Sequence, residues 1–92
     1  MDNIYLEVSP NPFARQAAVR FYLPQPGPAT VNIFGLQGQL VRQLHDGHLD
    51  AGEYQRQWDG TDRNGNPLPS GVYLLQLRAE EEVVNKKVLL QH

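Results

Sequence analysis

The chain has 92 residues, of which 40% are apolar, and it carries a formal net charge of −2 at pH 7 with no cysteine. This length suits one domain with its own core, and the apolar content is too high for a disordered chain. The lack of cysteine excludes disulfides and thiolate zinc sites, and the charge balance gives no electrostatic case for binding nucleic acid. No apolar run approaches the roughly 18 residues of a transmembrane segment, and no secretory signal peptide precedes the first strand-like segment. We therefore expect residues 1–92 to be a single domain of a longer secreted protein.

Short segments that alternate between apolar and polar residues run through the whole chain. They predict seven strands, at residues 4–9, 17–23, 29–36, 39–44, 53–58, 71–79 and 83–91. Proline-rich breaks, a polar loop at 45–52 and a charged turn at 80–82 separate several of them. No window carries a long apolar stripe at helical spacing without proline or glycine. The pattern predicts an all-β fold, a seven-stranded antiparallel immunoglobulin-like β-sandwich, with an open barrel as the competing architecture.

Residues 59–70 form the most distinctive stretch, because almost all of them are turn formers. We predict an ordered loop whose side chains bond its own backbone, held to the core by Trp58 and Tyr73 at its two ends. The side-chain oxygens of this loop could also hold calcium; they belong to Asp59, Asp62, Asn64 and Asn66. The spacing lacks the bidentate glutamate and the turn glycine of an EF-hand. Turn capping is the favoured interpretation, and calcium binding by residues 59–66 stays open.

The sequence contains no convincing catalytic constellation. His45 and His48 lie near Asp46 and Asp50 at a spacing that could hold a metal, but a solvated loop is the favoured interpretation. The two serines each neighbour a proline in a turn, and neither lies in a nucleophile elbow. We predict a domain that is not an enzyme, with no catalytic residue, no metal site and no cofactor.

Saccharide binding is a different function that a β-sandwich of this size can perform. Outward-facing aromatic rings would be needed, and the pattern places Tyr5, Tyr22 and Phe34 in such positions. Single exposed aromatics are common on protein surfaces, so the signal is weak. An accessory polysaccharide-binding module of a secreted glycoside hydrolase is therefore the alternative function.

Several short motifs follow one another in an order that is more specific than any one of them. They are Asn11-Pro12-Phe13, Val19-Arg20-Phe21-Tyr22-Leu23-Pro24, the segment 31–38, Ala51-Gly52-Glu53-Tyr54, Trp58-Asp59-Gly60, Asn64-Gly65, Pro69-Ser70-Gly71-Val72-Tyr73 and Lys86-Lys87-Val88-Leu89-Leu90. Together they cover nearly the whole chain and resemble the C-terminal sorting domain of proteins exported by the type IX secretion system of the Bacteroidetes. The chain is also similar to the immunoglobulin-like domain of the flagellar hook-capping protein, which shares the segment from Trp58 to Tyr73. A structural domain of a hook-capping protein is thus a third hypothesis.

The resemblance to the sorting family implies a non-catalytic domain that lies C-terminal to its cargo in the same chain. Such a domain directs export through the outer membrane and attachment of the cargo to the cell surface. The implied partners are the outer-membrane translocon, a surface sortase that can cleave the domain, and surface lipopolysaccharide. The implied location is secreted, on the exterior of the outer membrane.

The most motif-like positions of the family fall on Gly71, Tyr73, Lys86 and Lys87, which the resemblance implies are recognised by the secretion machinery. A structural role, in a turn and in core packing, is the favoured interpretation of Gly71 and Tyr73. The two lysines could instead guard a solvated edge strand against aggregation. We expect the last strand to lie at an exposed edge of the sandwich, where a receptor could add a strand to it.

Overall fold

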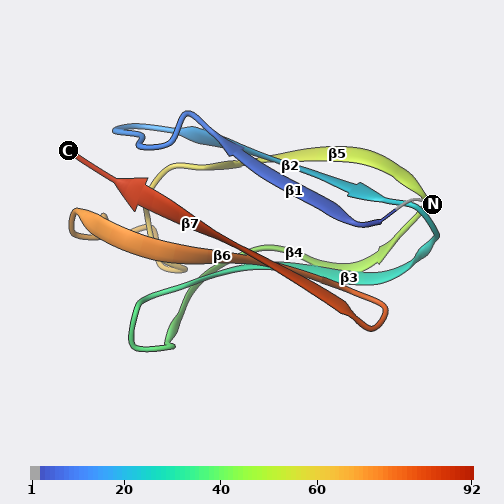
Figure 1. Cartoon of the computed structure of the whole chain (residues 1–92). Helices are drawn as coiled ribbons and strands as arrows, with labels where there is room; N and C mark the ends of the chain where they lie inside the picture. The colour runs from blue at the N-terminus through green and yellow to red at the C-terminus, as the bar shows by residue number, and fades with distance from the viewer. Residues whose placement is uncertain (1–2) are drawn as a thin grey trace.

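The computed structural model describes residues 3–92, so Met1 lies outside the described part. It confirms the predicted seven-stranded sandwich, whose two antiparallel sheets form the two layers of Figure 1. The strands are β1 (Tyr5–Ser9), β2 (Ala17–Leu23), β3 (Gly27–Phe34), β4 (Leu40–Leu49), β5 (Gly52–Trp58), β6 (Gly71–Ala79) and β7 (Glu82–Leu90). One sheet has the order β1-β2-β5, and the other has the order β4-β3-β6-β7. No helix within residues 3–92 is long and apolar enough to cross a membrane.

The core lies between the two sheets and is built from alternate residues of each strand. In β2 the inward residues are Val19, Phe21 and Leu23, and their side chains are buried. The other sheet contributes a matching row of buried aliphatic side chains: Val31, Ile33, Leu75, Leu77, Val88 and Leu90. Each sheet therefore buries one face against the other, which leaves both outer faces for solvent or partners.

Aromatic rings close the end of the core next to the loop at 59–70. The Phe13 and Trp58 ring centroids lie 5.2 Å apart, and Tyr73 meets Trp58 edge-on at 5.6 Å. The predicted attachment of the loop to the core through Trp58 and Tyr73 is thereby confirmed. The buried Phe13 fills the same end of the core.

The predicted polar loop at 45–52 is wrong over its first half, because β4 continues to Leu49. β3 begins at Gly27 rather than at 29, so its first residues give residues 45–49 a pairing partner along the backbone. Pro28 has no backbone N–H to donate to a neighbouring strand. This is tolerated because β6 pairs with β3 only as far as Ala29, so β6 does not lie beside Pro28. Edge strands tolerate polar side chains, and β4 is the edge of its sheet.

Candidate recognition surface along the final strand

Lys86 and Lys87 lie in the middle of β7, which is an edge strand of the four-stranded sheet. They stand opposite Leu75 and Leu74 of β6 in the antiparallel register. Since side chains alternate along a strand, the two lysines project from opposite faces of the sheet, and both are exposed. The edge of β7 therefore presents a cation on each of its sides.

The second half of the β7 edge is occupied by the segment between β1 and β2. The Asn11 side chain donates a hydrogen bond from Nδ2 to the Lys87 carbonyl at 2.9 Å and accepts one from the Leu89 N–H at 2.9 Å. The Phe13 N–H donates to the Leu89 carbonyl at 2.9 Å, and the Gln91 N–H donates to the Phe13 carbonyl at 2.8 Å. This segment acts as a short added strand, so the prediction of an exposed last strand holds only for the first half of β7.

The first half of β7 remains an open edge. Backbone groups along an antiparallel strand point alternately toward and away from the neighbouring strand. The Lys87 carbonyl and the Leu89 backbone form hydrogen bonds to groups outside the sheet. Val83 and Asn85 precede these residues by an even number of positions, so their backbone groups also point away from β6. Within residues 3–92 no strand other than β6 pairs with β7. Residues 83–87 can therefore accept a strand from a partner.

A hollow lies on each side of the lysine pair. The first, of about 230 Å³, lies between β1 and β7 and is lined by both lysines together with Tyr5, Leu6, Glu7, Val8 and Asn11. The second, of about 260 Å³, lies on the outer face of the four-stranded sheet, where Lys87 borders the apolar side chains of Phe34, Leu36, Val72 and Leu74. Leu36 is 74% exposed. Each lysine thus neighbours a recess that a partner side chain could enter.

Gly71 and Tyr73 lie in the framework at the start of β6. Tyr73 is buried, its hydroxyl donates to the Pro69 carbonyl at 2.6 Å, and burial raises the pKa of this hydroxyl. Gly71 has φ of 157°, and a Cβ there would meet no atom within 4 Å, so the backbone conformation rather than crowding favours glycine. The burial of Tyr73 and the positive φ of Gly71, which a residue with a Cβ rarely adopts, support the structural interpretation of both residues.

The loop at 59–70 bonds its own backbone as predicted. Asp59 Oδ1 accepts hydrogen bonds from the Thr61 N–H and hydroxyl, and these bonds lower the pKa of the Asp59 carboxyl. Asp62 Oδ1 accepts from the N–H groups of Asn64 and Asn66 at 2.9 and 3.0 Å. The carboxylates therefore have the capping role that the turn interpretation gave them.

Two contacts of this loop were not apparent from the sequence. Arg42 of β4 donates from Nη1 to the Thr61 hydroxyl at 2.8 Å and to the Asp62 carbonyl at 3.0 Å. The Trp58 indole N–H donates to the Thr61 carbonyl at 3.0 Å. These bonds tie the loop to both sheets, because Arg42 belongs to one sheet and Trp58 to the other.

The histidines near β4 do not converge on one point. His45 and His48 are three residues apart on a regular part of the strand, so their side chains lie on opposite faces. His45 Nδ1 lies 3.3 Å from Arg56 Nη2, whereas His48 Nε2 lies 3.7 Å from Asp50 Oδ1. In the described part of the chain no group of three or more histidine, aspartate or glutamate residues is arranged to hold a metal ion.

The three aromatic residues considered for saccharide binding are divided between the two sheets. Tyr5 and Tyr22 are direct neighbours on the outer face of the three-stranded sheet. Phe34 belongs to β3 and borders the hollow on the other sheet. The structure therefore brings two of the three rings together.

The sequence profile of the FlgD Ig-like domain family matches residues 9–82 of this chain. The chain also resembles two solved FlgD structures, each at 26% identity. For FlgD from Xanthomonas campestris the TM-score is 0.61, over 94% of this chain and 65% of that one. For FlgD from Pseudomonas aeruginosa the TM-score is 0.57, over 82% of this chain and 59% of that one. No curated protein sequence matches the chain.

Two larger proteins of Porphyromonas gingivalis contain a domain of the same fold, each at 21% identity over 95% of this chain. Dimeric latent PorU gives a TM-score of 0.74, and PorZ, described as an essential surface component of the type IX secretion system, gives 0.64. This chain spans only 9% of PorU and 11% of PorZ. At this identity the likeness shows the fold of the domain.

Proposed function

The chain belongs to the FlgD Ig-like domain family, and from this premise we propose that it is a non-catalytic C-terminal sorting domain of the type IX secretion system. In this role it directs an N-terminal cargo of the same protein through the outer membrane and attaches that cargo to the cell surface. The occurrence of the same sandwich in PorU and PorZ supports the link to this pathway. The ordered motifs along nearly the whole chain support the sorting role over a structural role in the flagellar hook cap.

The observation that carries the proposal is the position of Lys86 and Lys87 at the boundary between the open and the covered halves of the β7 edge. The backbone before them is available for pairing, and the backbone after them is held by Asn11 and Phe13. A translocon strand that adds to residues 83–87 would place its own side chains beside both lysines and their hollows. Cations at these two points give the receptor a charge pattern to read.

Attachment follows export in this proposal. The domain reaches the exterior of the outer membrane, where a sortase cleaves it and transfers the cargo to lipopolysaccharide. The two-residue Asp50–Ala51 connection joins β4 and β5, neither of which pairs with β7, so recognition at this edge leaves that connection accessible.

A reporter fusion tests the sorting role directly. Residues 1–92 are placed at the C-terminus of a periplasm-targeted fluorescent protein, in a bacterium with a type IX system and in a mutant that lacks it. We expect protease-accessible reporter on the surface of the competent strain only. Reporter that stays in the periplasm of both strains would refute the sorting role.

Charge reversal tests the recognition surface. The double variant Lys86→Glu, Lys87→Glu should reduce surface reporter at least about tenfold while the domain remains folded, since both side chains are exposed. The matched control is Arg15→Glu, Arg63→Glu, which makes the same change in net charge at two exposed positions outside β7. Equal export of the two double variants would show that the lysines are not read by the machinery.

A further inference from the structure

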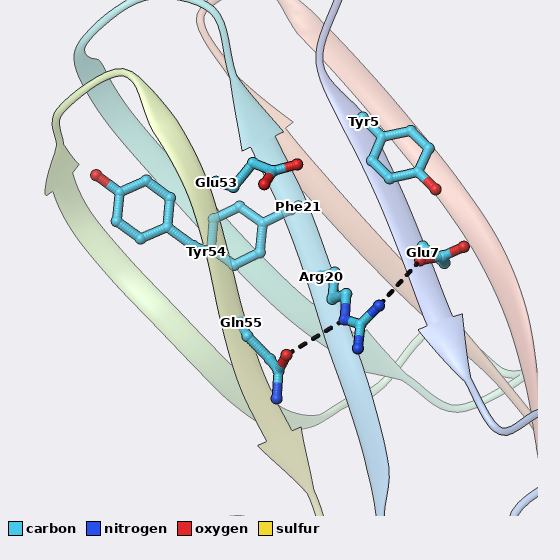
Figure 2. Close-up of a pocket in the computed structure, with 7 residues that line it drawn as sticks. All are labelled: Tyr5, Glu7, Arg20, Phe21, Glu53, Tyr54 and Gln55. Atoms are coloured by element: carbon cyan, nitrogen blue, oxygen red, sulfur yellow. Dashed lines mark hydrogen bonds and ion pairs between the residues drawn. The ribbon is translucent and has the colours of Figure 1, made fainter.

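The outer face of the three-stranded sheet carries a hollow of about 400 Å³, which shares Tyr5 and Glu7 with the hollow between β1 and β7. Its walls come from all three strands, and Figure 2 shows Arg20 in the middle, with Tyr5 and Glu7 on one side and Glu53 and Gln55 on the other. Phe21 and Tyr54 also border the hollow, but their rings stack at 5.5 Å on the core side of the sheet, which leaves Tyr5 as the aromatic ring on the outer face. The hollow thus combines an aromatic ring, two carboxylates, an amide and a guanidinium.

Arg20 joins the two walls of this hollow. Its Nε donates to Gln55 Oε1 at 3.2 Å, and its Nη1 lies 4.0 Å from Glu7 Oε1 (Figure 2). Exposed contacts of this kind contribute little to stability. They bring the three side chains together on one face, and the Gln55 amide keeps its Nε2 donor group for a partner because Arg20 uses only its oxygen.

Tyr5 and Glu53 form a second row across the same face, with Tyr22 between them in the strand register. The Tyr5 ring is 50% exposed, and a hydrogen bond to Glu7 raises the pKa of its hydroxyl. Within residues 3–92 the Glu53 carboxylate has no hydrogen-bond or ion-pair partner. This row therefore offers one ring for packing and one carboxylate for accepting hydrogen bonds.

We propose that this face binds a neutral saccharide. A pyranose ring has an apolar C–H face that can pack on the Tyr5 ring and equatorial hydroxyls that can bond planar polar groups. The Glu53 carboxylate accepts from two hydroxyls, and the Gln55 amide donates to a third. Small-molecule sites typically combine an aromatic surface with a few fixed polar groups of this kind.

The charges of the hollow favour a neutral ligand over a cationic peptide. Arg20 already balances Glu7, which leaves Glu53 as the only net charge among the residues that line the hollow. One exposed carboxylate gives a weak attraction that physiological salt screens. A neutral saccharide gains its affinity from packing and hydrogen bonds, so its binding should be nearly independent of salt.

The saccharide site can be distinguished from the sorting role, because binding is tested on the purified domain without any secretion machinery. Binding is followed by two-dimensional ¹⁵N–¹H NMR during titration with cellohexaose, xylohexaose and the delipidated O-polysaccharide of an outer membrane. The two hexasaccharides represent free polysaccharide, and the O-polysaccharide represents the cell surface. We expect shifts confined to β1, β2 and β5 with at least one ligand, unchanged in 0.5 M NaCl.

Variants assign the binding to the hollow. Tyr5→Ala and Glu53→Ala should each weaken binding at least about tenfold, whereas Tyr5→Phe should keep it because the ring remains. The control is Leu36→Ala, which removes a more exposed apolar side chain from the turn between β3 and β4 and should have no effect. The proposal is overturned by the absence of shifts with all three ligands, by loss of binding in salt, or by equal binding of the control and the Tyr5→Ala variant.

Discussion

Asn11 closes the second half of the β7 edge, and its replacement tests whether that closure stabilises the fold. Asn11→Ala removes both hydrogen bonds to the β7 backbone, the one to the Lys87 carbonyl and the one from the Leu89 N–H. Each hydrogen bond contributes about 0.5–1.5 kcal/mol, and the exposed setting of these two favours the lower part of the range. We therefore expect the free energy of unfolding to fall by about 1–2 kcal/mol.

A loss of this size is readily measured in so small a domain. A change of 1 kcal/mol shifts the Tm by about 4–8 °C in domains of roughly 60–100 residues, so Asn11→Ala should melt about 4–16 °C lower. Thermal unfolding is followed by circular dichroism. Amide hydrogen exchange adds a local readout, because the Leu89 N–H loses its acceptor and should exchange faster while the Val88 N–H, which faces β6, should not.

The matched control is Asn64→Ala, which truncates an exposed asparagine whose backbone rather than side chain is used by its loop. Surface changes of this kind are usually within about 0.5 kcal/mol. If Asn11→Ala and Asn64→Ala have the same Tm, and if exchange at Leu89 is unaltered, the Asn11 contact does not stabilise the edge. The account of a half-closed strand would then be refuted.

Three further changes test other parts of the structure. Trp58→Phe should cost about 2 kcal/mol in urea unfolding, because it loses the bond to the Thr61 carbonyl and contacts with Phe13; a cost below 0.5 kcal/mol would contradict this packing. The pKa of Asp59 is lowered in the folded state, so its contribution to stability is present above its ordinary value near 3.8 and is lost as the pH falls through the lower folded value. The Asp59→Asn variant should therefore lose less Tm than the wild type when the pH is lowered below about 4. An equal loss of Tm in the two proteins would refute the contribution of Asp59 to acid unfolding. Glu80 has φ of 57°, so Glu80→Gly should melt at a higher temperature than Glu80→Ala.

Most of the fold could be predicted because alternation along the strands is a local signal. β2 and β6 begin and end at the predicted residues, since Pro24 follows β2, Gly71 begins β6, and each strand buries one face. β4 could not be bounded in this way, because residues 45–49 are polar and their strand conformation depends on pairing with the start of β3. Arg56 could not be placed from alternation alone, because it lies half-buried on edge strand β5 with its guanidinium 5.9 Å from the Phe21 ring centroid.

The candidate surface was only partly predictable. The pattern of β7 and its place at the end of the chain indicated an edge strand with two exposed lysines, and the register confirms that position. The role of Asn11 was missed, because its contacts join residues 76 and 78 positions apart and leave no local trace. The one available signal was the position of Asn11 between two prolines. Prolines have no backbone N–H, so at a strand edge the Asn11 side chain can supply both the donor and the acceptor.

The half-closed edge also limits how a receptor can bind. The open stretch offers the N–H and C=O groups of Val83 and Asn85 and the N–H of Lys87, so an added strand gains few backbone bonds. At about 0.5–1.5 kcal/mol each, these five bonds give about 2.5–7.5 kcal/mol in total. Association alone costs an estimated 4–15 kcal/mol or more, so backbone pairing does not suffice for stable recognition. The missing free energy must come from side chains beside the open stretch, and the two lysines with their adjoining hollows are the groups in position to supply it. Export should therefore depend more strongly on Lys86 and Lys87 than on the strand propensity of residues 83–85.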